Sequence, residues 1–145
     1  MSNFDNEHGF ANSRARLRMT TLYQVAAANK GIVVGTGNKV EDFGVGFYTK
    51  YGDGGVDISP IADCNKSQVW ELGKELGILR EIINAAPTDG LWDDGRTDEG
   101  QLGLKYEELE EAMSNPHSPN RAKYEIIRKQ NLHKMEPIPV CKIPN

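Results

Sequence analysis

The turn Gly-Thr-Gly-Asn at residues 35–38 is the first feature of this chain that suits chemistry. It follows the apolar run 31–35, which is typical of a buried parallel strand, and open α/β sheets bind ligands at the carboxyl ends of such strands. It is not a dinucleotide fingerprint, because Val40 stands in place of the third glycine, and no Walker lysine follows. The turn predicts either a ligand-binding loop or an ordinary structural turn.

Charged side chains follow this turn. Glu41 comes three residues after it, which suits either helix capping or a magnesium ligand. Lys50, Asp53 and Asp57 frame a glycine-rich segment, as solvated charges or as contacts to ribose and phosphate. Lys66 begins a predicted helix, where it is either exposed or faces an anion. A lysine about 4 Å from a phosphate oxygen gains roughly 4 kcal/mol at an effective dielectric of 20, so an acidic chain can still bind a polyanion.

Other candidate sites are weaker or excluded. Arg14, Arg16 and Arg18 lie in one predicted helix, as a solvated face or as a contact to an anion or a partner. The three histidines share no spacing and the two cysteines are isolated, so no zinc signature is present. The acidic segment 89–99 fails the EF-hand pattern, because Leu91 occupies a ligand position.

Helices must position these residues. Start and stop signals predict helices over residues 13–29, 66–77, 80–84, 106–113 and 118–130. Between them, the long loop 87–103 is expected to be functional or mobile. We expect an irregular segment at 1–12, a main body at 13–136 and an extended tail at 137–145.

The predicted fold class is α/β with an incomplete sheet. Residues 32–34 are predicted to form a central strand, and residues 58–61 either a short strand or an extended link, since Pro60 limits ladder bonding. A strand that is apolar on both faces needs neighbours on both edges, and parallel neighbours require crossovers of a dozen or more residues. We therefore expect this chain to hold only part of a sheet.

Composition excludes several classes of protein. The chain has 145 residues, a net charge of −4 and 38% hydrophobic residues, with a pI of about 5.4. The acidic balance argues against nucleic-acid binding and against a membrane surface. No apolar run approaches the roughly 20 residues of a membrane span. Two cysteines are too few for a disulfide framework, so we expect a reduced, cytoplasmic protein.

Five segments read together resemble a known family. The segments 15–19, 33–41, 49–66, 87–103 and 133–139 have the order and spacing of ammonia-dependent NAD synthetases, and the resemblance covers nearly the whole chain. The family belongs to the ATP pyrophosphatases. The resemblance therefore implies an α/β fold that is part of a Rossmann-like parallel sheet flanked by helices, with the N-terminal strands and the pyrophosphate loop missing.

The resemblance also implies a reaction. ATP adenylates the nicotinate carboxylate of deamido-NAD and releases pyrophosphate, and ammonia then displaces AMP to give NAD. Mg²⁺ serves as cofactor and ATP as co-substrate. The carried-over positions are Thr36, Lys66 and Thr88 for ATP, Glu41 for Mg²⁺, and Arg16, Lys50, Asp57, His133 and Lys134 for deamido-NAD.

Two departures qualify the resemblance. Cys64 replaces an apolar family residue and is expected to be a small buried substitute. The Ser-Gly-Gly-x-Asp-Ser loop that holds pyrophosphate in the family is absent. We therefore expect a C-terminal portion of a synthetase that is inactive alone. It would act as a homodimer once a separate N-terminal chain, or the rest of an interrupted gene product, completes the sheet. The alternative is a catalytically incomplete nucleotide-binding or dimerisation fragment.

Overall fold

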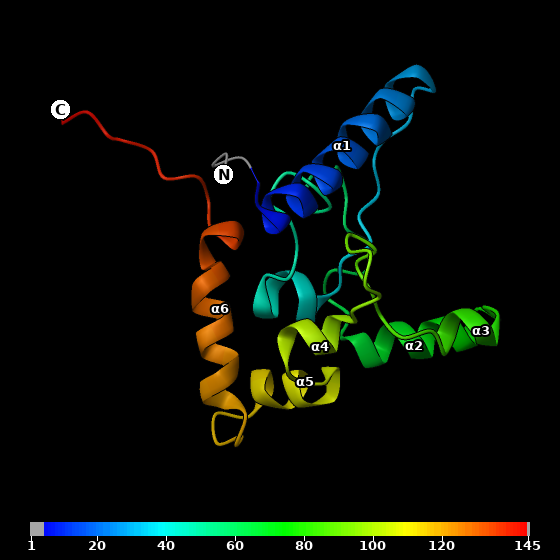
Figure 1. Ribbon diagram of the computed structural model, residues 1–145, viewed down its shortest axis with the longest axis vertical. Helices are drawn as coiled ribbons and strands as arrows, with labels where there is room; N and C mark the ends of the chain where they lie inside the picture. The colour runs from blue at the N-terminus through cyan, green and yellow to red at the C-terminus, as the bar shows by residue number, and fades with distance from the viewer. Residues whose placement is uncertain (1–4, 145) are drawn as a thin grey trace.

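The computed structural model describes residues 5–144 and is helical throughout its ordered elements (Figure 1). Its elements are α1 (Glu7–Ala28), the π-helix η1 (Lys39–Val45), α2 (Lys66–Glu75), α3 (Arg80–Ile83), α4 (Asp98–Leu102), α5 (Tyr106–Ser114) and α6 (Arg121–Met135). None of these helices is long and apolar enough to cross a bilayer.

Helix α1 begins earlier than its sequence signals predict. Asn6 is the N-cap, because its side-chain oxygen accepts a hydrogen bond from the Gly9 N–H at 2.8 Å. The expected start at residue 13 is therefore wrong, and part of the segment expected to be irregular is helical. Residues 1–4 of that segment lie outside the described residues. The predicted stop is confirmed, since the helix ends at Ala28.

The other helices follow their predicted signals closely. α2 starts after Asn65, whose N–H is accepted by the Gln68 side chain at 2.8 Å, and Gly77 follows the helix with φ +68. α3 and α5 occupy the expected places. α6 starts at Arg121, three residues later than expected, and continues to Met135. The expected long loop contains α4 at its end.

The predicted Rossmann-like parallel sheet is wrong for the described residues. Residues 5–144 contain one isolated parallel bridge, between Val34 and Ile58, supported by a 2.7 Å hydrogen bond from the Gly35 N–H to the Ile58 carbonyl. The pairing ends at once, because the chain turns at Ser59 and Pro60. Val33 is buried but Val34 is 52% exposed, so the apolar run is covered on one face only. An apolar run can predict a strand, but it does not supply the neighbouring strands that must pair with it.

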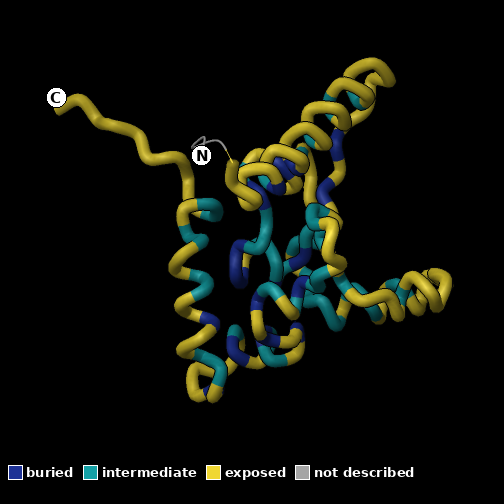
Figure 2. Tube along the Cα trace, in the orientation of Figure 1, coloured by how far each residue is buried: buried dark blue, intermediate teal, exposed yellow. Residues whose placement is uncertain are grey.

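The hydrophobic core lies where η1, α5 and α6 meet. Its buried members are Val40, Val45, Leu102, Leu104, Tyr106, Leu109, Ala112 and Tyr124. Figure 2 shows buried residues gathered in this region, while α1 and the α2–α3 arm extend from it with exposed surfaces. The half-buried Cys64 is less covered than predicted. The glycine-rich segment is therefore attached to the elements that enclose this core.

Basic residues of α6 bind the carbonyl groups at the end of η1. Arg128 donates to the Gly44 carbonyl at 2.8 Å, and Lys134 donates to the carbonyls of Gly46 and Tyr48 at 2.8 and 2.7 Å. Gly46 has φ +66, and a Cβ there would lie 2.7 Å from a side-chain carbon of α6. Only glycine allows this close approach without strain. The contacts fix η1 against α6.

Candidate functional site

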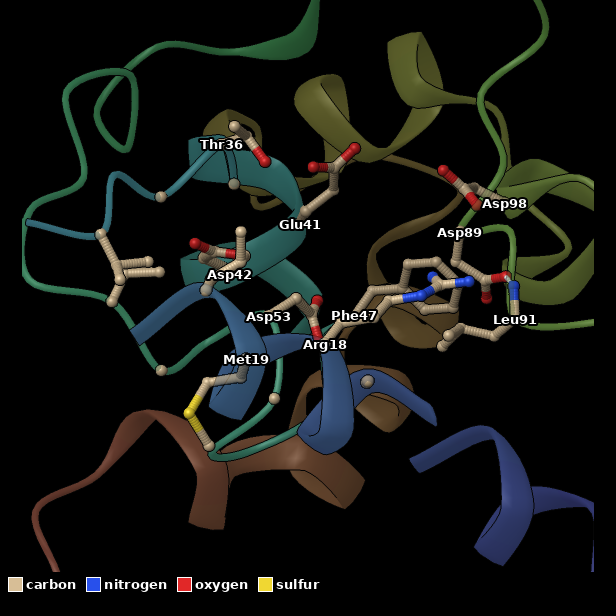
Figure 3. A pocket seen from close by; sticks show the side chains of 18 of the residues that line it. Arg18, Met19, Thr36, Glu41, Asp42, Phe47, Asp53, Asp89, Leu91 and Asp98 are labelled. Carbon is tan, nitrogen blue, oxygen red and sulfur yellow. Dashed lines mark hydrogen bonds between the residues drawn. The ribbon is translucent and has the colours of Figure 1, made fainter. Parts of the chain in front are cut away.

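A pocket of about 500 Å³ lies between α1, the Gly-Thr-Gly-Asn turn with η1, and residues 87–97, which we call the acidic loop. Thr36, Glu41, Lys66 and Thr88 all line it. They come from four different segments of the chain. Figure 3 shows Thr36, Glu41 and Asp42 on one side of the pocket and Asp89 and Leu91 on another. The fold thus brings together every residue predicted to contact ATP or magnesium.

Asn38 fixes the turn that leads into the pocket. Its side chain is 2% exposed, and its oxygen accepts the N–H groups of Val40 and Glu41 at 3.0 and 3.1 Å. Asn38 is thus the N-cap of η1, and Glu41 lies in the first turn of that helix. Asn38 and not Glu41 therefore caps the helix, and the Glu41 side chain lines the pocket. Gly37 packs against the Asp42 carboxylate, where a Cβ would overlap it.

Glu41 and Lys66 form a partly buried ion pair. The Lys66 ammonium lies 2.8 Å from Glu41 Oε1, and the two side chains are 17% and 15% exposed. The hydroxyl of Tyr106 lies 2.6 Å from the same Oε1. The Lys66 ammonium also lies 4.7 Å from the centre of the Tyr106 ring, a cation–π distance. Burial, and then the charge of Glu41, raise the pKa of Tyr106.

Asp98 is the second carboxylate on Tyr106. Its Oδ2 lies 3.1 Å from the Tyr106 hydroxyl, and the residue is 6% exposed. Its Oδ1 is buried without a hydrogen-bond partner among the described residues. Burial is the main cause that raises the pKa of Asp98. Thr97 caps α4 by accepting the Gly100 N–H at 3.1 Å, which places Asp98 in the first turn. Sequence reasoning missed Asp98, although the Thr97 cap was a readable signal.

The pocket lining is acidic. Its carboxylates are Glu41, Asp42, Asp53, Asp89 and Asp98, and its cations are Arg18 and Lys66. Burial, and then the Glu41 and Asp53 charges, raise the pKa of Asp42 to about 6. Burial also raises the pKa of Asp53, whose Oδ1 accepts the Thr49 N–H at 2.9 Å. The excess of carboxylates favours a ligand that is cationic or that carries a cation with it.

The acidic loop is fastened to α1 by two arginines. Arg14 donates to the Leu91 carbonyl at 2.7 Å, and Arg18 donates to the Gly90 carbonyl at 3.0 Å. Arg14 also lies 3.5 Å from Asp93, an exposed partner. The face shared by Arg14 and Arg18 is therefore a contact to this chain's own loop. This contact holds the acidic loop where its residues Thr88 and Asp89 line the pocket.

Residues predicted to bind deamido-NAD lie outside the lining of this pocket. Three of them are connected by two successive hydrogen bonds. Arg16 donates to the Lys50 carbonyl at 3.3 Å, and the Lys50 ammonium donates to the His133 carbonyl at 2.7 Å. These hydrogen bonds join α1, the glycine-rich segment and the end of α6.

The remaining two predicted deamido-NAD residues are engaged elsewhere. Lys134 is held by the carbonyls at the end of η1, and burial lowers its pKa. Asp57 accepts the Val33 N–H at 2.7 Å and the Tyr23 hydroxyl at 3.2 Å. Asp57 thus supports the predicted strand segment, and the five residues do not form one site within the described chain.

Two carboxylates of the pocket have the chemistry of magnesium ligands. No group of three or more histidine, cysteine, aspartate or glutamate side chains within residues 5–144 is arranged as a metal site. Mg²⁺ in nucleotide sites, however, usually takes one or two carboxylates together with substrate phosphates and waters. The buried, unpartnered Asp98 Oδ1 and the nearby Glu41 carboxylate supply such oxygens.

Comparison with known proteins identifies relatives of this chain. The family model of NAD synthase matches residues 2–143. The NH(3)-dependent NAD(+) synthetase of Alkaliphilus oremlandii is 43% identical over 135 residues, which are 92% of this chain and 53% of the relative. That of Carboxydothermus hydrogenoformans is 49% identical over 100 residues, 69% of this chain and 40% of the relative. The chain spans about half the length of such relatives or less.

Solved structures give the same result. An NMN synthetase from Francisella tularensis superimposes with a TM-score of 0.85 at 35% identity, covering 98% of this chain and 58% of its own. An NH3-dependent NAD synthetase from Campylobacter jejuni gives 0.70 at 25% identity, covering 97% and 58%. The family match and the structural match both extend over almost all of the chain, which therefore belongs to the NAD synthase family.

Proposed function

We propose that this chain is the C-terminal portion of a cytoplasmic NH3-dependent NAD synthetase, a ligase that amidates deamido-NAD at the expense of ATP. The observation that carries the proposal is the convergence of Thr36, Glu41, Lys66 and Thr88 on one pocket. Those positions were assigned to ATP and magnesium by resemblance alone. Family membership supports the reaction class.

Lys66 has the charge and position to bind a phosphate group of ATP. Its ammonium is fixed by Glu41 and by the Tyr106 ring, so it needs little ordering on binding. The hydroxyls of Thr36 and Thr88 add neutral donors from two other segments that line the pocket. When bound by Glu41, Mg²⁺ would offset negative charge as pyrophosphate leaves.

The acidic loop covers one side of the proposed ATP site. Its attachment to α1 through Arg14 and Arg18 places Thr88 and Asp89 against the pocket. Such a cover excludes water from an acyl adenylate, which water would otherwise hydrolyse before ammonia attacks. Deamido-NAD is assigned to Arg16, Lys50 and the residues around them, with a second copy of the chain in a homodimer as the expected completion.

A mononucleotide substrate is the second candidate. The structural match to an NMN synthetase favours it, because that match has the higher TM-score and the higher identity of the two described. The same adenylation and ammonia transfer would then act on nicotinate mononucleotide. Both substrates present the same carboxylate, so the pocket described here serves either reaction.

The experiment is a product assay with ATP, Mg²⁺ and ammonium. Deamido-NAD and nicotinate mononucleotide are supplied in parallel, and NAD, NMN and AMP are measured. The chain is tested alone and together with a polypeptide that carries a Ser-Gly-Gly-x-Asp-Ser loop. We expect amidated product only in the mixture, and loss of product in Lys66→Met. Full activity of the chain alone would refute the need for a second polypeptide, and no product in the mixture would refute the assignment.

A further inference from the structure

We propose that Asp98 is a second carboxylate of the divalent-cation site, coupled to Glu41 through the hydroxyl of Tyr106. This inference rests on the proposed function, which places Mg²⁺ at Glu41. It extends that site to α4 and α5, two helices that carry none of the residues assigned by resemblance.

The hydrogen bonds of Glu41 leave one of its oxygens for a ligand. Lys66 and Tyr106 both contact Oε1, at 2.8 and 2.6 Å. The hydrogen bonds to the Glu41 carboxylate within the described chain all go to Oε1, and the residue lines the pocket. Two donors on one oxygen fix the orientation of the carboxylate, so its second oxygen is held in place for a cation.

Asp98 is similar to Glu41 in that one of its oxygens contacts Tyr106 and the other has no partner. Its Oδ2 lies 3.1 Å from the same Tyr106 hydroxyl, and its Oδ1 is the unpartnered, buried oxygen described above. Leaving a carboxylate oxygen buried without a partner costs free energy, so the position is expected to receive a ligand. A ligand of matching chemistry is a divalent cation or one of its bound waters. Glu41 and Asp98, which both line one pocket (Figure 3), thus contact one phenol hydroxyl, and the second oxygen of each carboxylate has no hydrogen-bond donor among the described residues.

Tyr106 gives this pair its rigidity. The residue is 1% exposed and belongs to the hydrophobic core, and the Trp70 ring packs edge-on against it at 6.1 Å between ring centres. Its hydroxyl has one proton, which the 2.6 Å contact assigns to Glu41. Asp98 is therefore the less satisfied of the two carboxylates, and neutralisation by a cation gains most there.

The test is a titration of the ¹⁵N-labelled 145-residue chain with Mn²⁺ alone, followed by paramagnetic broadening of amide signals. We expect broadening centred on the amides of residues 41 and 98. Asp98→Asn should raise the Mn²⁺ concentration at half-broadening by about 10- to 100-fold. Asp63→Asn is the matched control, because Asp63 is exposed outside the pocket and pairs with Lys39. It should leave the titration unchanged.

Tyr106→Phe tests the coupling without removing a carboxylate, and it decides the case if Asp98→Asn does not fold. We expect weaker Mn²⁺ binding in Tyr106→Phe and unchanged binding in Tyr124→Phe, a buried tyrosine of the same core. If Glu41→Gln removes the broadening while Asp98→Asn and Tyr106→Phe bind as wild type, the inference is overturned and magnesium at Glu41 stands. If the wild-type chain shows no broadening near residue 41, both are overturned.

Discussion

The ion pair between Glu41 and Lys66 allows a quantitative test of the site. Charges 2.8 Å apart attract by about 6 kcal/mol at an effective dielectric of 20. Desolvation of two largely buried side chains offsets much of this attraction. We therefore expect Lys66→Met to reduce the free energy of unfolding by about 3 kcal/mol, because Glu41 stays buried without its partner. The double variant Glu41→Gln/Lys66→Met should recover about 2 kcal/mol of coupling.

The assay is a double-mutant cycle in urea, followed by tryptophan fluorescence, since Trp70 packs against the Tyr106 ring that contacts both charged groups. The matched control cycle uses Lys39 and Asp63, which lie at a similar 2.9 Å but are 44% and 97% exposed. That surface pair should show negligible coupling, and salt should affect the buried pair little. A coupling between Glu41 and Lys66 no larger than that of the surface pair would refute the reasoning.

Three further perturbations test other parts of the structure. Burial and neighbouring carboxylates raise the pKa of Asp42 from 3.8 to about 6, so its contribution to stability is present below 3.8 and lost as the pH rises through 6. The difference in unfolding free energy between Asp42→Asn and wild type, measured in urea, should therefore shift by about 1 kcal/mol in favour of the variant as the pH rises from about 4.5 to about 7.5, after a discount for partial exposure. An equal difference at both pH values would contradict this. Gly46→Ala, which meets α6 at φ +66, should cost about 3 kcal/mol, whereas Gly77→Ala, with nothing within 4 Å, should cost about 1 kcal/mol by thermal melting. The double variant Arg14→Ala/Arg18→Ala should speed hydrogen exchange in the acidic loop, and unchanged exchange would show that the two hydrogen bonds do not hold it.

Local signals in the sequence predicted the helices well. Asn65, the glycine after α2 and the Asn29-Lys30-Gly31 stop act through hydrogen bonds within a few residues, so they can be read without knowledge of the tertiary structure. The start of α1 was missed because Asn6 lies in a segment without apolar periodicity. Its cap nevertheless gives the helix a complete first turn.

The sheet could not be predicted from the apolar run alone. Pattern reasoning requires strand neighbours for residues 32–34, but the described chain supplies one bridge and leaves Ile32 59% exposed. Strand formation depends on partners that are distant in sequence, and no local rule provides them. For the candidate site, resemblance pointed to Glu41 and Lys66, and both residues line one pocket. Their link through Tyr106 and Asp98 is a tertiary contact that no spacing reveals.

We propose that the pocket between α1, η1 and the acidic loop binds ATP together with a divalent cation. The most direct measurement is a map of amide chemical shifts in the ¹⁵N-labelled chain as ATP and Mg²⁺ are added. We expect the largest saturable shifts at Thr36, Glu41, Lys66 and Thr88. Shifts confined to other surfaces, or none at millimolar ATP, would contradict the account.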